Sequence, residues 1–255
     1  MDADWLQRTE TLLGAEAMER LGRARVYIFG LGAVGSYAVE GLARTGVGML
    51  RLVDFDTIKE SNRNRQLYAL RSTLGLAKTD VARSRVLDIN PDCRVEAVRE
   101  FAHAGSLEAL LDGGPDLIVD AIDSLNPKVD LIQAGVKLGV PVFSALGAAT
   151  RLDCGAVRFG KLFGTKGCPL GRLVRKRLRR RGVDDGDLWC VYSDEDRNLD
   201  AVRERGTEEP GDEEEYRRGR DRRVLGSIAT LTGIFGLRLA HEAVLRLAAA
   251  PRSAP

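Results

Sequence analysis

Residues 25–56 read RVYIFGLGAVGSYAVEGLARTGVGMLRLVDFD, and this stretch decides the fold. It begins with a β-branched and aromatic run, which is typical of a buried strand. Apolar residues then recur every three to four positions, as on a helix, and MLRLVDFD predicts a second strand. A strand, a glycine loop, a helix and a strand within about 30 residues form a βαβ unit.

The glycine loop has the spacing GxGxxG, with glycines at Gly30, Gly32 and Gly35. In this context the first glycine allows a tight turn, the second lets the backbone approach a phosphate, and the third lets the helix pack closely on the strand. Asp54 ends the second strand, where it is placed to accept hydrogen bonds from ribose hydroxyls, and Asp56 belongs to the same candidate site. The unit predicts an adenine nucleotide or dinucleotide site; the alternative is a glycine-rich turn without a ligand.

Short hydrophobic strands alternate with helices on both sides of this unit. We expect further strands at 94–98, 116–123, 140–145, 156–159 and 189–193, and helices at 10–21, 78–90, 127–138, 169–181 and 226–250. Helices between such strands imply a largely parallel sheet covered on both faces. The predicted fold is α/β, a Rossmann-like nucleotide-binding core with a mixed-sheet C-terminal extension, in one main domain over residues 10–250.

Charge and composition narrow the classes of protein. The 39 basic and 37 acidic residues nearly cancel, so a nucleic-acid or membrane partner must be argued from local clusters. The start MDADWLQRTE lacks the layout of an export signal, which predicts a cytoplasmic protein. Charged residues interrupt the apolar C-terminal stretch, which predicts a packed helix and no membrane insertion. Acidic and basic clusters with few apolar residues predict a mobile charged loop at 194–223.

Cations after the second strand distinguish ATP from a dinucleotide. The segment SNRNRQ places Asn62, Arg65 and Gln66 there, and Lys78 follows LGLA. A triphosphate needs fixed cations around its outer phosphates as well as backbone amides. Each residue by itself is better explained as a solvated helix residue, but the set behind the glycine loop favours ATP.

Two aspartates, Asp120 and Asp123, follow the buried strand in DAIDS. Ligands bind at the carboxyl ends of strands in such sheets, and a carboxylate there can hold Mg²⁺ that bridges ATP phosphates. Asp123 lies beyond the strand end and is the predicted magnesium ligand. Asp120 is left to cap or orient the loop, and a helix N-cap is the simpler alternative for Asp123.

The combination of RTETLLG, GLGAVGS, LVDFD, NRNRQ, LGLAK, INP and DAIDS resembles the ThiF/MoeB/HesA family, bacterial relatives of ubiquitin-activating enzymes. Within it, CVYSDE after a basic helix and GSIATLTGIFGL look like the branch that dehydrates threonylcarbamoyladenosine at position 37 of tRNA. The resemblance implies that Asp54 binds ribose, that Asp123 binds Mg²⁺, and that the substrate carboxylate is adenylated before it cyclises. Contacts to ATP are implied for Asn62, Arg65, Gln66 and Lys78.

The same resemblance implies a homodimer, in which Arg8 reaches the phosphates of the neighbouring subunit's ATP. Sulfur-carrier activators of this family commonly hold structural zinc with two CxxC pairs. The sequence has none, so no zinc is expected and adenylation of a ubiquitin-like sulfur carrier is the alternative function. A dinucleotide oxidoreductase or a noncatalytic nucleotide-binding protein is the third. Cys154 and Cys168 stand where such dehydratases often have proline and aspartate, so neither is given a role.

Two further features concern the substrate. The helix RLVRKRLRRRG is predicted to bind tRNA phosphates through a broad basic face, and a solvated basic helix is the alternative. That face is made of Arg172, Arg175, Lys176, Arg177, Arg179, Arg180 and Arg181. Cys190, in CVYSDE, is the candidate covalent residue, because nearby cations would lower its pKa and its thiolate would accept an acyl group or sulfur from a transfer partner. A buried structural thiol is the preferred interpretation, because the cyclisation already has an internal nucleophile and requires no enzyme thiol.

Overall fold

The computed structural model describes residues 4–203 and 224–249 of the chain. Its centre is a seven-stranded sheet of order β3-β2-β1-β4-β5-β7-β6. The strands are β1 Arg25–Phe29, β2 Met49–Val53, β3 Arg94–Val98, β4 Leu117–Asp120, β5 Val142–Ala145, β6 Val157–Lys161 and β7 Leu188–Ser193. All neighbours pair in parallel except β6 and β7, which are antiparallel. The prediction of a Rossmann-like core with a mixed-sheet extension is confirmed.

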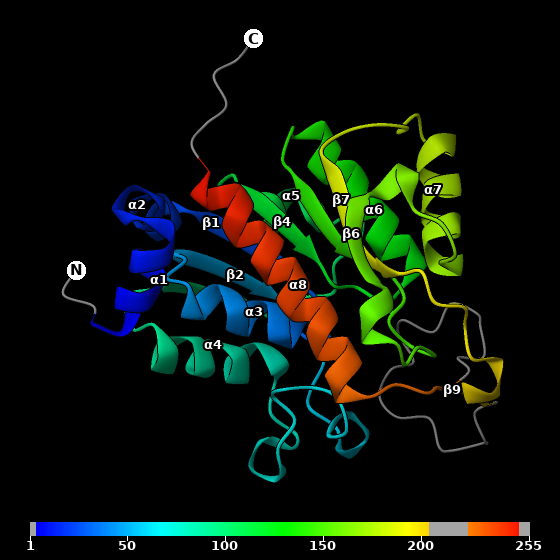
Figure 1. Cartoon of the computed structure of the whole chain (residues 1–255), viewed down its shortest axis with the longest axis horizontal. Helices are drawn as coiled ribbons and strands as arrows, with labels where there is room; N and C mark the ends of the chain where they lie inside the picture. Colours follow the sequence, from blue (N-terminus) through cyan, green and yellow to red (C-terminus); the bar gives the residue numbers. More distant parts are fainter. Residues whose placement is uncertain (1–3, 204–223, 250–255) are drawn as a thin grey trace.

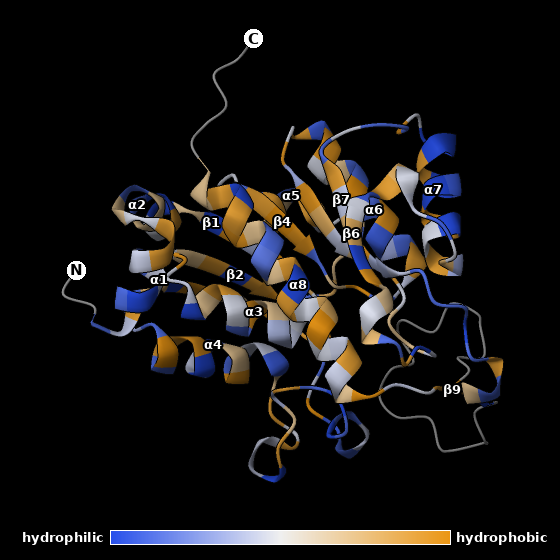
Figure 2. Ribbon diagram, viewed as in Figure 1, coloured by the Kyte–Doolittle hydropathy of each residue, from blue (hydrophilic) through white to orange (hydrophobic). Residues whose placement is uncertain are grey.

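Helices cover both faces of this sheet (Figure 1). They are α1 Gln7–Leu13, α2 Ala15–Arg23, α3 Gly35–Arg44, α4 Lys78–Ile89, α5 Leu107–Leu111, α6 Leu125–Lys137, α7 Pro169–Arg180 and α8 Ala229–Ala248. Helices α2, α3, α4 and α8 pack on one face, and α5, α6 and α7 on the other. Along β1, Val26 and Ile28 enter the first core while Tyr27 and Phe29 enter the second, which is why this strand is hydrophobic at consecutive positions (Figure 2).

The strand order places the nucleotide loop at a topological switch point. From β1 the chain crosses to β2 on one side, whereas β4 pairs with β1 on the other side. The chain therefore leaves a crevice at the carboxyl end of β1, where doubly wound sheets bind ligands. Gly30 lies at this end, and the carboxyl ends of β2, β4 and β5 meet at the same edge.

The N-terminal region differs from the single helix expected at residues 10–21. Gly14 has a φ of 87°, a conformation that suits glycine, and it separates α1 from α2. The short helix α5 was not predicted because five residues are too few to show a helical period. Short 3-10 helices complete the described ranges: η1 Asp4–Leu6, η2 Glu60–Asn62, η3 Arg71–Thr73, η4 Cys154–Ala156, η5 Leu162–Gly164 and η6 Leu199–Ala201.

Part of the predicted charged loop has defined partners. Strand β8, Val202–Arg203, pairs with β9, Val224–Leu225. The Glu195 carboxylate accepts hydrogen bonds from the backbone N–H groups of Leu152 and Asp153, each at 2.9 Å. Residues 204–223 lie outside the described residues, so the mobility of that segment stays a prediction. In the ranges that the structure describes, no helix combines the length and apolar character needed to cross a membrane.

Candidate active site

The three glycines of the loop meet three different steric conditions. Gly30 has a φ of 89°, and a Cβ there would lie 2.7 Å from the backbone oxygen of Ala121. A Cβ at Gly35 would lie only 1.8 Å from the Gly30 oxygen, so the start of α3 sits directly on the loop. The nearest atom to a Cβ at Gly32 is Nε2 of Gln66, at 3.7 Å. The space beside Gly32 is thus open, as close approach of a phosphate requires.

Asp54 holds the glycine loop in place through a hydrogen bond. It is 8% exposed, and its Oδ2 accepts a hydrogen bond from the Leu31 N–H at 2.7 Å, inside the loop. Its Oδ1 accepts one from the Asp56 N–H at 2.9 Å. Burial raises the pKa of this carboxyl, against the lowering effect of Lys78 and the two N–H groups. One carboxylate therefore fixes the loop at the ribose side of the candidate site.

Lys78 is brought to the same carboxylates by an isolated bridge between Thr57 and Ala77. Its Nζ lies 2.7 Å from Oδ2 of Asp56 and 3.8 Å from Oδ2 of Asp54. The side chain is 6% exposed, whereas that of Asp56 is 31% exposed. The ammonium is consequently held at the edge of the sheet, and one of its two partners faces solvent.

The segment NRNRQ forms a tight turn beside this cation. The Asn62 backbone oxygen accepts hydrogen bonds from the N–H groups of Arg65 and Gln66, at 3.1 and 2.9 Å. Arg65 donates from Nη1 to the Ser61 oxygen and to Oδ1 of Asn64, both at 2.8 Å. The turn keeps the half-buried Gln66 beside the loop, where its Nε2 would lie 3.7 Å from a Cβ at Gly32.

Two side-chain contacts attach this turn to the rest of the fold. The Leu67 N–H donates to Oγ of Ser36, in the first turn of α3, at 3.2 Å. Nδ2 of Asn64 donates to the backbone oxygen of Ser227 at 3.1 Å, just before α8. Neither attachment was predicted, because each joins residues far apart in sequence.

The two aspartates of DAIDS have different environments. Asp120 is fully buried, and its Oδ2 lies 2.6 Å from Nζ of Lys128 and accepts a hydrogen bond from Oγ of Ser144 at 2.6 Å. Its Oδ1 accepts from the Ile122 N–H at 3.1 Å, so Asp120 orients the loop that carries Asp123. Lys128 and Ser144 were not predicted from the sequence, although a lysine on an otherwise apolar helix face was a signal of a buried ion pair.

Asp123 is exposed and accepts a hydrogen bond from Oγ of Ser124 at 3.1 Å. The N-cap of α6 is Ser124, so Asp123 is not itself the cap. Within residues 4–203 and 224–249, no group of three or more His, Cys, Asp or Glu side chains is arranged to hold a metal. Mg²⁺ is commonly bound by one or two carboxylates with substrate phosphates and water as its other ligands, and an exposed Asp123 fits that arrangement.

Arg8 lies away from the glycine loop of its own chain. It is an exposed residue of α1, two positions after Leu6. A Cβ at Gly46 would lie 2.9 Å from Cδ1 of Leu6, which places this region just beyond the C-terminal end of α3. The loop lies at the N-terminal end of α3, and ten residues of helix span roughly 15 Å. The Arg8 segment therefore lies near the end of α3 that is far from the glycine loop, and contact between Arg8 and an ATP phosphate of a second copy stays a prediction.

Cys190 lies in the interior of the sheet. It is fully buried on β7, in register with Ser144 and Gly160, and its Sγ lies 3.6 Å from the Gly160 oxygen. Burial and then the neighbouring Cys168 raise its pKa to about 12, and Lys128 and Arg175 offset this only in part. The expectation that nearby cations lower this pKa is wrong, because desolvation outweighs them. The geometry favours the structural alternative.

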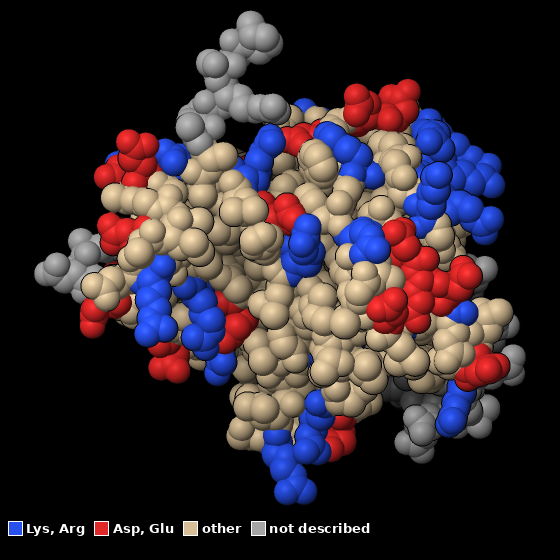
Figure 3. All heavy atoms as spheres, viewed as in Figure 1, with Lys and Arg blue, Asp and Glu red and all other residues tan. Residues whose placement is uncertain are grey.

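The basic helix α7 divides into inward and outward cations. Arg175 donates from Nη1 to Oγ1 of Thr165, and burial lowers its pKa. Arg181 pairs with Asp130, and the guanidinium of Arg179 lies 5.3 Å from the centre of the Phe163 ring. The exposed cations of this helix are Arg172, Lys176, Arg179 and Arg180. They contribute to the group of blue side chains over α7 in Figure 3.

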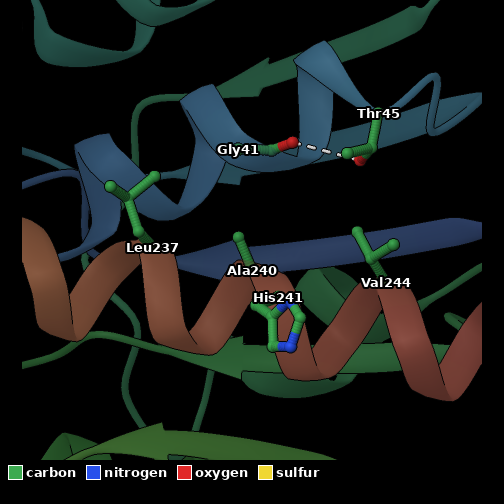
Figure 4. Close-up of a pocket in the computed structure, with 6 residues that line it drawn as sticks. All are labelled: Gly41, Thr45, Leu237, Ala240, His241 and Val244. Atoms are coloured by element: carbon green, nitrogen blue, oxygen red, sulfur yellow. Dashed lines mark hydrogen bonds between the residues drawn. The ribbon is translucent and has the colours of Figure 1, made fainter. Parts of the chain in front are cut away.

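A shallow hollow between α3 and α8 is separate from this site. Its volume is about 200 Å³, and Gly41, Thr45 and His241 are among the residues that line it (Figure 4). It lies along the C-terminal half of α3, whereas the glycine loop lies before the first turn. The lining is mostly apolar and suits no triphosphate.

Comparison with known proteins agrees with this geometry. The tRNA threonylcarbamoyladenosine dehydratase of Bacillus subtilis is 37% identical over 207 residues, which are 81% of this chain and 80% of that protein. The enzyme of the same name from Escherichia coli is 36% identical over 205 residues, 75% of each chain.

Solved structures of the E. coli enzyme in complex with AMP and with ATP superpose with TM-scores of 0.84 and 0.83, at 30% and 29% identity. Each alignment covers 97% of this chain and 96% of the other. The sequence profile of the ThiF family matches residues 6–254, nearly the whole chain. The resemblance inferred from the motifs is confirmed, and the chain belongs to the ThiF family.

Proposed function

We propose that this protein is an ATP-dependent tRNA threonylcarbamoyladenosine dehydratase, which cyclises threonylcarbamoyladenosine at position 37 of tRNA. The observation that carries the proposal is similarity over 97% of the chain to a dehydratase solved with AMP and with ATP. Three features support the proposal: the open space beside Gly32, the hydrogen bond from the loop to the Asp54 carboxylate, and two cations at one sheet edge. The two cations are Lys78 and Arg65.

The chemical problem is that a carboxylate is a poor electrophile, since its leaving group would be oxide. A carboxylate oxygen of the threonyl group attacks the α-phosphorus of ATP, and the bond to the bridging oxygen of pyrophosphate breaks. The carbamoyl group then attacks the activated carbonyl carbon and expels AMP. The nucleoside loses one water overall, and ATP becomes AMP and pyrophosphate.

The residues of the site have distinct roles in this proposal. The open backbone at Gly32 and the amides at the start of α3 bind phosphate, while Asp54 accepts hydrogen bonds from ribose. Lys78 and Arg65 stabilise the charge that moves onto pyrophosphate, which is an electrostatic and positioning role. Mg²⁺ held by Asp123 would neutralise phosphate charge when bound.

A homodimer completes the phosphate site in this proposal. The position of the Arg8 segment near the C-terminal end of α3, away from its own glycine loop, supports this. The site is then assembled from both chains, and dilution to monomers should abolish turnover.

The exposed cations of α7 form the proposed tRNA surface. Arg172, Lys176 and Arg180 lie on one side of a helix that buries Val174 and Leu178. We place the protein in the cytoplasm, where tRNA is modified. The reaction has an internal nucleophile and needs no sulfur-transfer partner, and the buried Cys190 gives such a partner no accessible thiol.

The decisive experiment is incubation with ATP, Mg²⁺ and tRNA that carries or lacks threonylcarbamoyladenosine. AMP release and loss of one water from the modified nucleoside, by mass spectrometry, are the expected results. AMP release that depends on a ubiquitin-like carrier protein and not on tRNA would instead identify the sulfur-carrier activity.

A further inference from the structure

Arg151 is a buried arginine with unpaired donors. The residue is 3% exposed, and Nε and Nη1 of its guanidinium find no hydrogen-bond acceptor in the part of the chain that the structure describes. Arginine keeps its charge at physiological pH, and a buried charged donor without an acceptor loses its hydration uncompensated. An anion that binds there would remove this penalty.

The backbone around Arg151 is held firmly in place. Thr150 has a φ of 63°, which is uncommon for a β-branched residue. Its N–H donates to the Gly226 oxygen at 2.8 Å, and its oxygen accepts from the Asn198 N–H at 3.0 Å. The Glu195 carboxylate accepts hydrogen bonds from the backbone N–H groups of Leu152 and Asp153, the two residues after Arg151. The position of Arg151 is therefore specified on both sides.

The Arg151 segment is linked by hydrogen bonds to the NRNRQ turn through the residues before α8. Arg151 follows β5, whose neighbour β4 carries Asp123 beyond its carboxyl end. Thr150 bonds to Gly226, and the adjacent Ser227 accepts from Asn64 of the NRNRQ turn. Two hydrogen bonds thus connect the Arg151 segment to the turn that holds Arg65.

We propose that Arg151 binds an oxyanion of the RNA substrate, and that this oxyanion is the carboxylate to be adenylated. The inference rests on the proposed function. A carboxylate and a triphosphate repel each other, so a cation is needed to bring the carboxylate to the α-phosphorus. Lys78 and Arg65 are assigned to the phosphates in the proposed function, whereas the buried Arg151 has two donors, Nε and Nη1, without an acceptor among the described residues.

The test compares Arg151→Gln and Arg151→Lys with the wild type, and Arg158→Gln is the matched control. Arg158 is a half-exposed arginine that pairs with Asp194 on the neighbouring sheet segment. Arg151→Gln should raise KM for modified tRNA about tenfold or more and leave KM for ATP unchanged, because a charge-assisted contact to the carboxylate is lost. Arg151→Lys should recover part of the loss, and Arg158→Gln should behave as wild type.

Unfolding temperature separates this role from a structural one. Replacing an unpaired buried charge by a neutral amide should keep or raise the unfolding temperature, whereas a large drop would make Arg151 structural and overturn the proposal. A raised KM for ATP, or an unchanged KM for tRNA, would also overturn it.

Binding without ATP gives a readout that does not need turnover. Wild type should bind modified tRNA more tightly than unmodified tRNA, and Arg151→Gln should lose that preference. Weaker binding of both tRNAs, with a reduced salt dependence, would identify a backbone phosphate as the oxyanion. If the wild-type protein is inactive but its preference for modified tRNA depends on Arg151, the proposed reaction is refuted and the Arg151 site is retained. If the wild-type protein is active but its preference for modified tRNA does not depend on Arg151, the Arg151 site is refuted and the proposed reaction is retained.

Discussion

Two lysine–aspartate pairs lie near the carboxyl edge of the sheet, and they differ in exposure. Lys128 and Asp120 are both fully buried, and Ser144 donates to the same carboxylate oxygen. Lys78 is almost as buried, but its nearer partner Asp56 is 31% exposed. The two Nζ to Oδ2 distances are similar, at 2.6 and 2.7 Å, so distance alone does not separate the pairs.

The comparison teaches that the surroundings of an ion pair decide whether it is available to a ligand. Around Asp120, every observed contact holds the loop before α6 in place, and no solvent reaches the charges. Around Lys78, the nearer carboxylate, Asp56, is partly exposed to solvent, and we propose that a phosphate approaches the ammonium from that side. We call the first the closed pair and the second the open pair.

The largest expected effect is on stability, at the closed pair. Lys128→Met leaves Asp120 buried without its counterion and should lower the free energy of unfolding by about 3–5 kcal/mol. Urea unfolding followed by circular dichroism measures this. Lys128→Met combined with Asp120→Leu should recover much of the loss. A stability like that of wild type for the single variant would mean that the pair is not closed.

At the open pair, we expect a large loss of activity and an unchanged fold. Lys78→Ala, and equally Arg65→Ala or Asp123→Ala, should reduce AMP formation by roughly 10²–10³-fold, because each removes charge stabilisation at the phosphates. Far-ultraviolet circular dichroism should remain that of the wild type. Turnover at the wild-type rate in all three variants would refute the assignment of the site.

Helix α7 also carries both cations that turn inward and cations that are exposed to solvent. Replacing Arg172, Lys176 and Arg180 by Ala should weaken tRNA binding and reduce the slope of log K against log salt by about 0.7–0.9 per lost phosphate contact. A control variant with Arg23, Arg83 and Arg94 replaced, all exposed elsewhere, should keep the wild-type slope. An unchanged slope in the first variant would place the RNA surface elsewhere.

The smallest effect is expected at Cys190, which is fully buried like the closed pair. Cys190→Ser should retain ATP-dependent dehydration, since the buried thiol, with a pKa of about 12, stays protonated at neutral pH. In the native protein, iodoacetamide at pH 8 should modify the exposed Cys154 and leave Cys190 unmodified. Loss of cyclisation with adenylate formation preserved, in a folded variant, would make Cys190 a covalent participant.

Local patterns were sufficient for much of the fold. The βαβ unit at residues 25–56, the glycine loop and the strands of the parallel sheet followed from periodicity and spacing, because these depend on neighbours in sequence. Asp123 was correctly separated from Asp120 by its position beyond the strand end. The break at Gly14 and the short α5 were missed, since neither changes the apolar period over a long enough stretch.

Local sequence patterns therefore predict the α/β class and the glycine loop after the first strand. Which charges are available depends on the tertiary structure: Asp120 joins Lys128 and Ser144, Arg175 turns inward, and Nε and Nη1 of the buried Arg151 find no acceptor in the described ranges. Strand order brings these residues together across gaps in sequence that no local pattern spans. Burial then determines their chemistry, because a charge or thiol removed from water is governed by the few groups that remain in contact with it.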